Sequence, residues 1–138
     1  MYTNDALIRV RYGETDQMGI VYHGNYYTWF EVGRSEFFSS LGYTYRRLEE
    51  EGIILPVTES SCRYIKPAKY YDEIIIRTKI DTLKGIRITF SYEVIRKEDD
   101  VLLASGKTIH GFVNKDLKPV KIKKVNKEVW DILEQCTK

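Results

Sequence analysis

One long apolar helix limits what this chain can fold into. Over residues 25–42, large apolar side chains recur at helical spacing and cover more than one narrow stripe, which predicts a helix wrapped by other structure. We expect Asn25 to cap its first turn and Gly42 to take the left-handed conformation that ends it. The apolar set is Tyr26, Trp29, Phe30, Gly33, Phe37 and Leu41.

The segments around this helix alternate with the two-residue period of half-buried strands. Residues 74–80 and 88–94 read as a hairpin joined at Lys84-Gly85, and the alternation continues over residues 102–112. Earlier strands are expected at residues 7–12 and 54–64, and shorter helices at 43–51 and 126–136. Because no βαβ unit occurs, we predict an α+β fold, one antiparallel sheet wrapped around one long central helix.

Composition limits the number of domains and the class of partner. With 138 residues, 43% of them hydrophobic, the chain can bury one core, so we expect a single domain over residues 1–138. A net charge of +2 is too small for a nucleic-acid surface, and we expect no such partner. No run approaches the roughly 18 apolar residues of a membrane span, and the first residues lack a signal-peptide pattern. A cytoplasmic location is expected.

Several common kinds of site lack support. Cys62, Cys136 and the two histidines show no zinc-ligand spacing, so neither a disulfide framework nor a metal is expected. Gly106-Lys107-Thr108 lies inside a strand pattern and lacks the first glycine of a phosphate-binding loop. There is no G-x-S-x-G or dinucleotide fingerprint. We interpret Cys62 as a small buried residue and the six lysines of residues 115–127 as a solvated face.

The segment from Arg11 to Arg34 remains as the candidate site. Asp16 lies in a glycine-containing loop that leads into the start of the apolar helix. Unpaired N–H groups at a helix N-terminus can polarise a carbonyl and stabilise an oxyanion, and a nearby carboxylate can act as general base or nucleophile. Aspartate before a helix is also a common cap or turn residue, and His23 could orient a substrate or simply fill the helix entrance.

These residues carry a resemblance to a known family. The stretch DQMGIVYHGNY at residues 16–26, followed by Glu31 and Arg34, resembles the signature of hotdog-fold acyl-CoA thioesterases of the 4-hydroxybenzoyl-CoA thioesterase type. RYIKPA at residues 63–68 is similar to the strand that follows in that family. The resemblance is densest over residues 11–34 and extends, through the order of elements, to nearly the whole chain.

The resemblance implies roles for particular residues. Asp16 corresponds to the catalytic carboxylate, and His23 to the helix start, where a backbone N–H faces the thioester oxygen and the side chain takes part in some members. Tyr12 corresponds to a supporting tyrosine. Other matched residues are expected to bind substrate, and basic residues of the following strand to meet the phosphates of coenzyme A. The residues expected to bind substrate are Gly19, Val21, Tyr22, Asn25 and Tyr26. Those expected to meet the phosphates are Arg63 and Lys66, with Lys69.

Glu31 lies where another hotdog branch keeps its catalytic carboxylate. Its three-residue spacing to Arg34 also suits an ordinary ion pair on a helix surface. We interpret Glu31 as structural.

The activity implied is hydrolysis of an acyl-CoA to a free carboxylic acid and coenzyme A, without metal or redox cofactor. The family also implies homodimers or homotetramers with the active site at the dimer interface. Three alternatives remain. The carrier could be an acyl carrier protein, docked by a basic segment such as residues 115–127. The domain could bind an acyl thioester without chemistry, although a purely apolar binder would not need Asp16. The third is hydration or dehydration of an acyl thioester. The segment from Asp16 to His23 favours this reaction less than hydrolysis.

Overall fold

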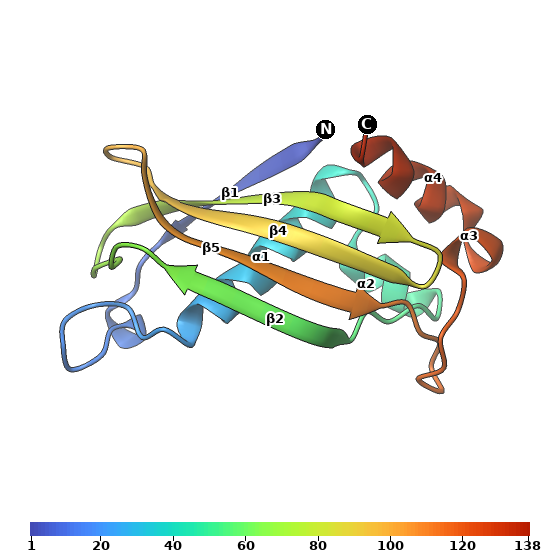
Figure 1. Ribbon diagram of the computed structural model, residues 1–138, viewed down its shortest axis with the longest axis horizontal. Coiled ribbons are helices and arrows are strands. Elements are labelled where there is room, and N and C mark those ends of the chain that lie inside the picture. Colours follow the sequence, from blue (N-terminus) through green and yellow to red (C-terminus); the bar gives the residue numbers. More distant parts are fainter.

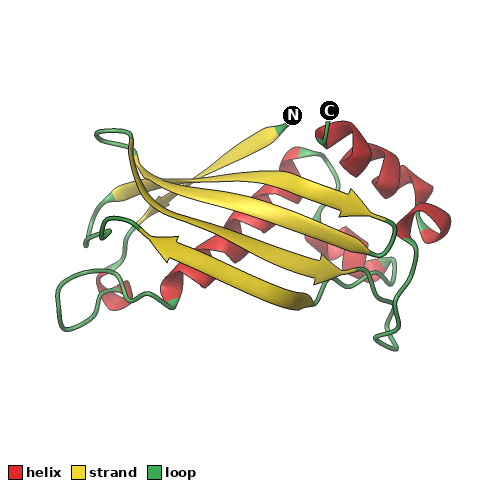
Figure 2. Cartoon of the chain, in the orientation of Figure 1, coloured by secondary structure: helices red, strands yellow, loops and turns green.

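The computed structural model describes residues 1–138 as a five-stranded antiparallel sheet curled around a long helix, α1 (Figures 1 and 2). The strands lie in the order β1-β3-β4-β5-β2. In chain order the elements are β1 (Thr3–Arg9), the 3₁₀ turn η1 (Tyr12–Glu14), α1 (Asn25–Ser40), α2 (Tyr45–Glu50), β2 (Val57–Tyr64), β3 (Glu73–Lys84), β4 (Arg87–Arg96), β5 (Val101–Gly111), α3 (Ile122–Val125) and α4 (Lys127–Cys136). The predicted α+β architecture is confirmed.

The centre of the sheet follows the alternation in the sequence. In β3, Ile74, Ile76 and Ile80 are fully buried. Ile76 lies opposite Val94 and Ile80 opposite Phe90 in the β3–β4 pair. Because alternate side chains of a strand point to one face, these residues form the sheet surface on which α1 packs. The predicted hairpin is therefore confirmed.

Helix α1 approaches this surface closely. A Cβ atom added to Gly33 would lie 2.6 Å from Oγ1 of Thr78 and 2.8 Å from Cγ2 of Ile76. The ring of Phe30 stacks on Tyr92 with centroids 4.3 Å apart and planes 9° apart. These contacts fix the position of α1, and with it the start of the helix, relative to the sheet.

The far side of α1 corrects one expectation. Tyr27 and Val32 are each 37% exposed, and Glu31 is exposed as well. Within one chain the sheet covers one side of the helix and leaves the other exposed, which is less cover than the apolar pattern of the sequence predicted.

Arg34 corrects a second expectation. The predicted surface ion pair with Glu31 does not form, because Arg34 turns inward and is only 8% exposed. Its Nη1 donates a hydrogen bond of 3.1 Å to the hydroxyl of Tyr92. Residues three apart on a helix can form an ion pair. Here the guanidinium of Arg34 is buried between α1 and the sheet, whereas Glu31 is exposed, so the two side chains do not meet.

A buried chain of hydrogen bonds continues from Tyr92. Its hydroxyl lies 2.6 Å from Oγ1 of Thr108, which lies 2.7 Å from Nε2 of His110. Nδ1 of His110 is 3.0 Å from the carbonyl oxygen of Leu55. A carbonyl can only accept, so Nδ1 donates to it. Burial lowers the pKa of His110 to about 4, so the ring is neutral near pH 7 and Nε2 accepts from the threonine hydroxyl.

Strand β1 differs from its predicted bounds. It covers Thr3–Arg9 rather than residues 7–12, since its pairing with β3 ends where Arg9 lies opposite Glu73. The chain then turns into η1, where Tyr12 is 77% exposed. The alternation in the sequence continues past the last residue that has a strand partner, which explains the error.

The ends of α1 were predicted in part. Gly42 has φ 75°, as expected of a left-handed stop. The cap residue is Gly24 rather than Asn25, which is already helical. The Asn25 side chain instead donates a hydrogen bond of 2.8 Å to the carbonyl oxygen of Glu14. None of the helices combines the length and apolar character needed to cross a membrane.

Candidate active site

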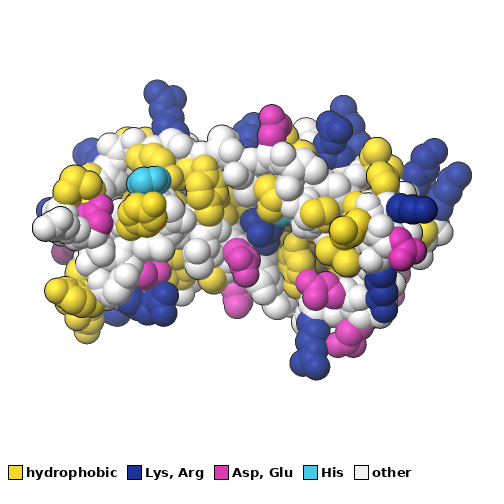
Figure 3. All heavy atoms as spheres, turned by 90° about the horizontal axis from the view of Figure 1, so that it is seen from below, with side chains coloured by type: hydrophobic (Ala, Val, Ile, Leu, Met, Phe, Trp, Pro, Cys, Tyr) yellow, Lys and Arg dark blue, Asp and Glu magenta, His cyan; other side chains and the backbone are white.

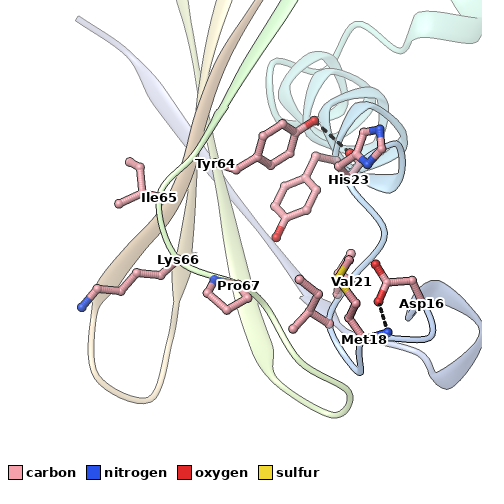
Figure 4. Close-up of a pocket in the computed structure, with 10 residues that line it drawn as sticks. Asp16, Met18, Val21, His23, Tyr64, Ile65, Lys66 and Pro67 are labelled. Carbon is pink, nitrogen blue, oxygen red and sulfur yellow. Dashed lines mark hydrogen bonds between the residues drawn. The ribbon is translucent and has the colours of Figure 1, made fainter.

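A cleft of about 280 Å³ lies beside the start of α1, between the loop that precedes the helix and the chain that follows β2 (Figure 4). Hydrophobic side chains gather at this end of the molecule (Figure 3). The cleft is lined by Asp16, Met18, Ile20, Val21, His23, Tyr26, Tyr64, Ile65, Lys66 and Pro67. It is thus mainly apolar with one carboxylate, a composition typical of a small-molecule site.

The loop that carries Asp16 is held by its own hydrogen bonds. The Asp16 N–H donates to the carbonyl oxygen of Ile20 at 2.8 Å, and Oδ1 accepts from the N–H of Met18 at 2.8 Å. Gly19 completes the turn with φ 80°, a conformation that favours glycine. The second carboxylate oxygen of Asp16 has no hydrogen-bond donor within the chain, so it is available to a ligand.

The start of α1 offers unpaired donors. The N–H of Asn25 donates to the carbonyl of Tyr22 at 2.9 Å, and that of Tyr26 to the carbonyl of His23 at 3.3 Å. The N–H groups of His23 and Gly24 donate to no acceptor in the chain. Because His23 lines the cleft, the positive end of the helix dipole lies beside Asp16.

Two tyrosines form the wall between the helix start and the end of β2. Tyr64 donates a hydrogen bond of 3.0 Å to the carbonyl of His23, and its ring packs edge-on against Tyr26 at 5.0 Å. The Tyr26 hydroxyl accepts from the N–H of Ala68 at 3.4 Å. Burial raises the pKa of both hydroxyls, so both are neutral at physiological pH. This wall is therefore ordered and uncharged.

The structure brings part of the predicted site together. The predicted residues that line the cleft are Asp16, Val21, His23, Tyr26 and Lys66. Three others belong to the same loop and helix start without lining it, namely Gly19, Tyr22 and Asn25. Tyr22 packs its ring against His23, with centroids 4.5 Å apart.

Besides Lys69, which does not line the cleft, two predicted residues lie elsewhere. Tyr12 packs edge-on against Tyr70, with ring centroids 5.6 Å apart, and does not line the cleft. Arg63 lines a separate polar cleft on the sheet together with Lys107. Neither position supports direct contact with a substrate bound beside Asp16.

Sequence reasoning missed residues on both sides of the cleft. Met18 and Ile20 belong to the matched loop, and Tyr64, Ile65 and Pro67 to the RYIKPA segment, but none was assigned a role. Their apolar character within two matched segments was the available signal. No group of three or more His, Cys, Asp or Glu side chains is placed to hold a metal ion.

Comparison with known proteins agrees with the fold. Residues 10–130 match the family model described as the thioesterase-like superfamily, and the chain belongs to that superfamily. It is 34% identical to YneP of Bacillus subtilis over 125 residues, 90% of each chain. It is 32% identical to the acyl-CoA thioesterase YbgC of Haemophilus influenzae over 103 residues, 74% of each chain.

Its structure is also similar to that of the DHNA-CoA thioesterase from Staphylococcus aureus. The TM-score is 0.94 at 33% identity, over 99% of this chain and 92% of that one. The resemblance to hotdog acyl-CoA thioesterases is therefore confirmed.

Proposed function

We propose that this protein hydrolyses acyl-CoA thioesters to a free carboxylic acid and coenzyme A, with Asp16 as the catalytic carboxylate. The observation that carries the proposal is one apolar cleft lined by Asp16, which has a free carboxylate oxygen, and by His23, whose N–H group and that of the next residue, Gly24, have no acceptor in the chain. Membership of the thioesterase-like superfamily and similarity to acyl-CoA thioesterases support the same activity.

The N–H groups at the helix start stabilise the developing negative charge on the thioester oxygen by donating hydrogen bonds to it. As that oxygen becomes negative in the tetrahedral intermediate, hydrogen bonds from His23 and Gly24 strengthen, which lowers the barrier. Collapse of the intermediate breaks the C–S bond and releases the thiolate of coenzyme A, which takes up a proton.

Asp16 can supply the nucleophile in two ways. As general base it removes a proton from the water that attacks the carbonyl carbon. As nucleophile it attacks directly and forms a mixed anhydride, which water then hydrolyses. Single-turnover hydrolysis in ¹⁸O-water distinguishes these routes, because only the second can place ¹⁸O in the Asp16 carboxylate.

The position of the positive charge favours a CoA ester over a carrier-protein ester. Lys66 lines the cleft itself, where the negatively charged phosphates of coenzyme A can reach it. The lysine-rich residues 115–127 lie near α3, at the end of the molecule opposite the cleft (Figure 1). Lys and Arg side chains also gather at that opposite end (Figure 3). A carrier protein docked there would not deliver its acyl group to Asp16.

Aromatic acyl groups are the first class to test. The similar Staphylococcus aureus enzyme is a DHNA-CoA thioesterase. Tyr26 and Tyr64 give this cleft an aromatic wall suited to a flat acyl group.

An even-numbered assembly is part of the proposal. Strand β2 pairs only with β5, so its outer edge is free, and seven of its eight residues are exposed. Pairing of two such edges would satisfy their backbone groups and cover the exposed side of α1. Light scattering after size-exclusion chromatography tests this, and a monomer would contradict it.

The activity is tested by release of free thiol from a panel of aromatic and aliphatic CoA esters of graded length. Carrier-protein thioesters with the same acyl groups serve as the comparison. We expect thiol release from CoA esters and slower release from the carrier protein. Measurable binding of CoA esters without any thiol release would instead favour a non-catalytic binding domain.

A further inference from the structure

Glu14 has a buried carboxylate two residues before Asp16. It is only 6% exposed and does not line the cleft. Its Oε2 accepts a hydrogen bond of 2.8 Å from the indole Nε1 of Trp29, and its Oε1 accepts one of 2.8 Å from the backbone N–H of Arg11. Both oxygens are thus occupied, so Glu14 is not placed to act on a substrate.

The backbone of Glu14 ties the same parts together. Its carbonyl oxygen accepts from the N–H of Tyr22 at 2.9 Å and from the side chain of Asn25 at 2.8 Å. Tyr22 is the residue before His23, and Asn25 begins α1. One residue therefore connects η1, both ends of the Asp16 loop and the first turn of the helix.

The indole that donates to the carboxylate is itself fixed. Trp29 is 1% exposed and packs against Tyr26, with ring centroids 4.8 Å apart. Burying a carboxylate costs free energy unless both of its oxygens accept hydrogen bonds. If either donor is removed, an unpaired buried oxygen therefore favours a rearrangement of the chain around it. Because Glu14 connects η1 to both ends of the loop that carries Asp16, such a rearrangement would shift that loop.

We infer that Glu14 is a positioning residue that sets the Asp16 carboxylate against the N–H groups of His23 and Gly24. The inference rests on the proposed function, because it assumes that Asp16 and those N–H groups act on one carbonyl. Their relative placement matters because a misplacement of about 1 Å can cost about a hundredfold in rate.

The test compares Glu14→Gln with a matched control, Tyr92→Phe. Gln keeps the size of the side chain but leaves it one acceptor oxygen for two donors. Tyr92→Phe removes a buried hydroxyl whose hydrogen-bond partners are Arg34 and Thr108 rather than any residue of the loop. We expect kcat of Glu14→Gln to fall about ten- to a hundredfold with KM within about twofold, and the control to keep wild-type kcat. Thermal unfolding confirms that each variant is folded at the assay temperature.

A double variant separates positioning from general destabilisation. If Glu14 acts through Asp16, Glu14→Gln costs about twofold or less in an Asp16→Asn background, because groups that act as a unit are not additive. An equal fold loss in both backgrounds, or an unchanged kcat in the single variant, overturns the inference. Inactive wild-type protein instead contradicts the proposed function.

Trp29→Phe provides a second route that adds no new polar group. It deletes the indole donor to Glu14 and keeps an aromatic ring against Tyr26. We expect the same loss of kcat at constant KM, even if Glu14→Gln does not fold. A Trp29→Phe variant that is folded and fully active overturns the inference.

Discussion

Protonation of His110 is expected to destabilise the protein in mild acid. The ring is 0% exposed, and burial, assisted by the charge of Arg34, lowers its pKa to about 4 from an ordinary 6.5. Because the folded-state pKa is the lower one, the stability contributed by the neutral ring is complete above pH 6.5 and is lost as the pH falls from 6.5 towards 4. The difference of about 2.5 pH units corresponds to about 3 kcal/mol, of which about 2 kcal/mol is lost by pH 5.

Urea unfolding at pH 7.5, 6 and 5 measures this loss. His110→Gln keeps a donor for Leu55 and an acceptor for Thr108 but cannot become charged. Between pH 7.5 and pH 5 its free energy of unfolding should therefore fall by about 2 kcal/mol less than that of the wild type. His23→Gln is the matched control, because it removes the exposed histidine and should follow the wild type. Equal pH dependence in the wild type and His110→Gln would refute this reasoning.

Two further predictions concern packing and capping. Gly33→Ala should lower stability by about 1–3 kcal/mol in thermal unfolding, despite the better helix propensity of alanine, because its Cβ would meet Ile76 at 2.8 Å. Gly85→Ala, whose nearest neighbour would be 4.0 Å away, is the control, and an equally stable Gly33→Ala would contradict the close packing. Asn126→Ala should cost about 1 kcal/mol, because Asn126 Oδ1 caps α4 by accepting from the N–H of Val129 at 3.1 Å. An unchanged melting temperature would show that this cap contributes nothing.

The fold was predictable where local periodicity and burial agree. The alternation around Ile74 and Ile80 and the helical spacing around Phe30 reflect surfaces that meet in the core. The end of β1 was not predictable, because a strand ends where its partner ends and the partner lies about 65 residues away along the chain. Arg34 was misplaced for a related reason. Its buried hydroxyl partner, Tyr92, belongs to β4, and helical spacing alone favours a surface position.

The candidate site was predictable on one side. Asp16 and His23 lie close in sequence, so the loop and the helix start that carry them could be found from the motif. The opposite wall depends on where β2 ends, which brings Tyr64 to the carbonyl of His23. Glu14 gave no signal, because a glutamate in a polar loop is ordinarily solvated and only the tertiary contact with Trp29 buries it.

Thiol release by Asp16→Asn tests the central claim most directly. Asparagine keeps the Oδ1 acceptor that holds the N–H of Met18, so the loop should stay folded while the negative charge is lost. With the CoA ester that the wild type hydrolyses fastest, we expect kcat to fall by at least about a hundredfold. Wild-type turnover in this variant, with the fold intact, would contradict the assignment of Asp16 as the catalytic carboxylate.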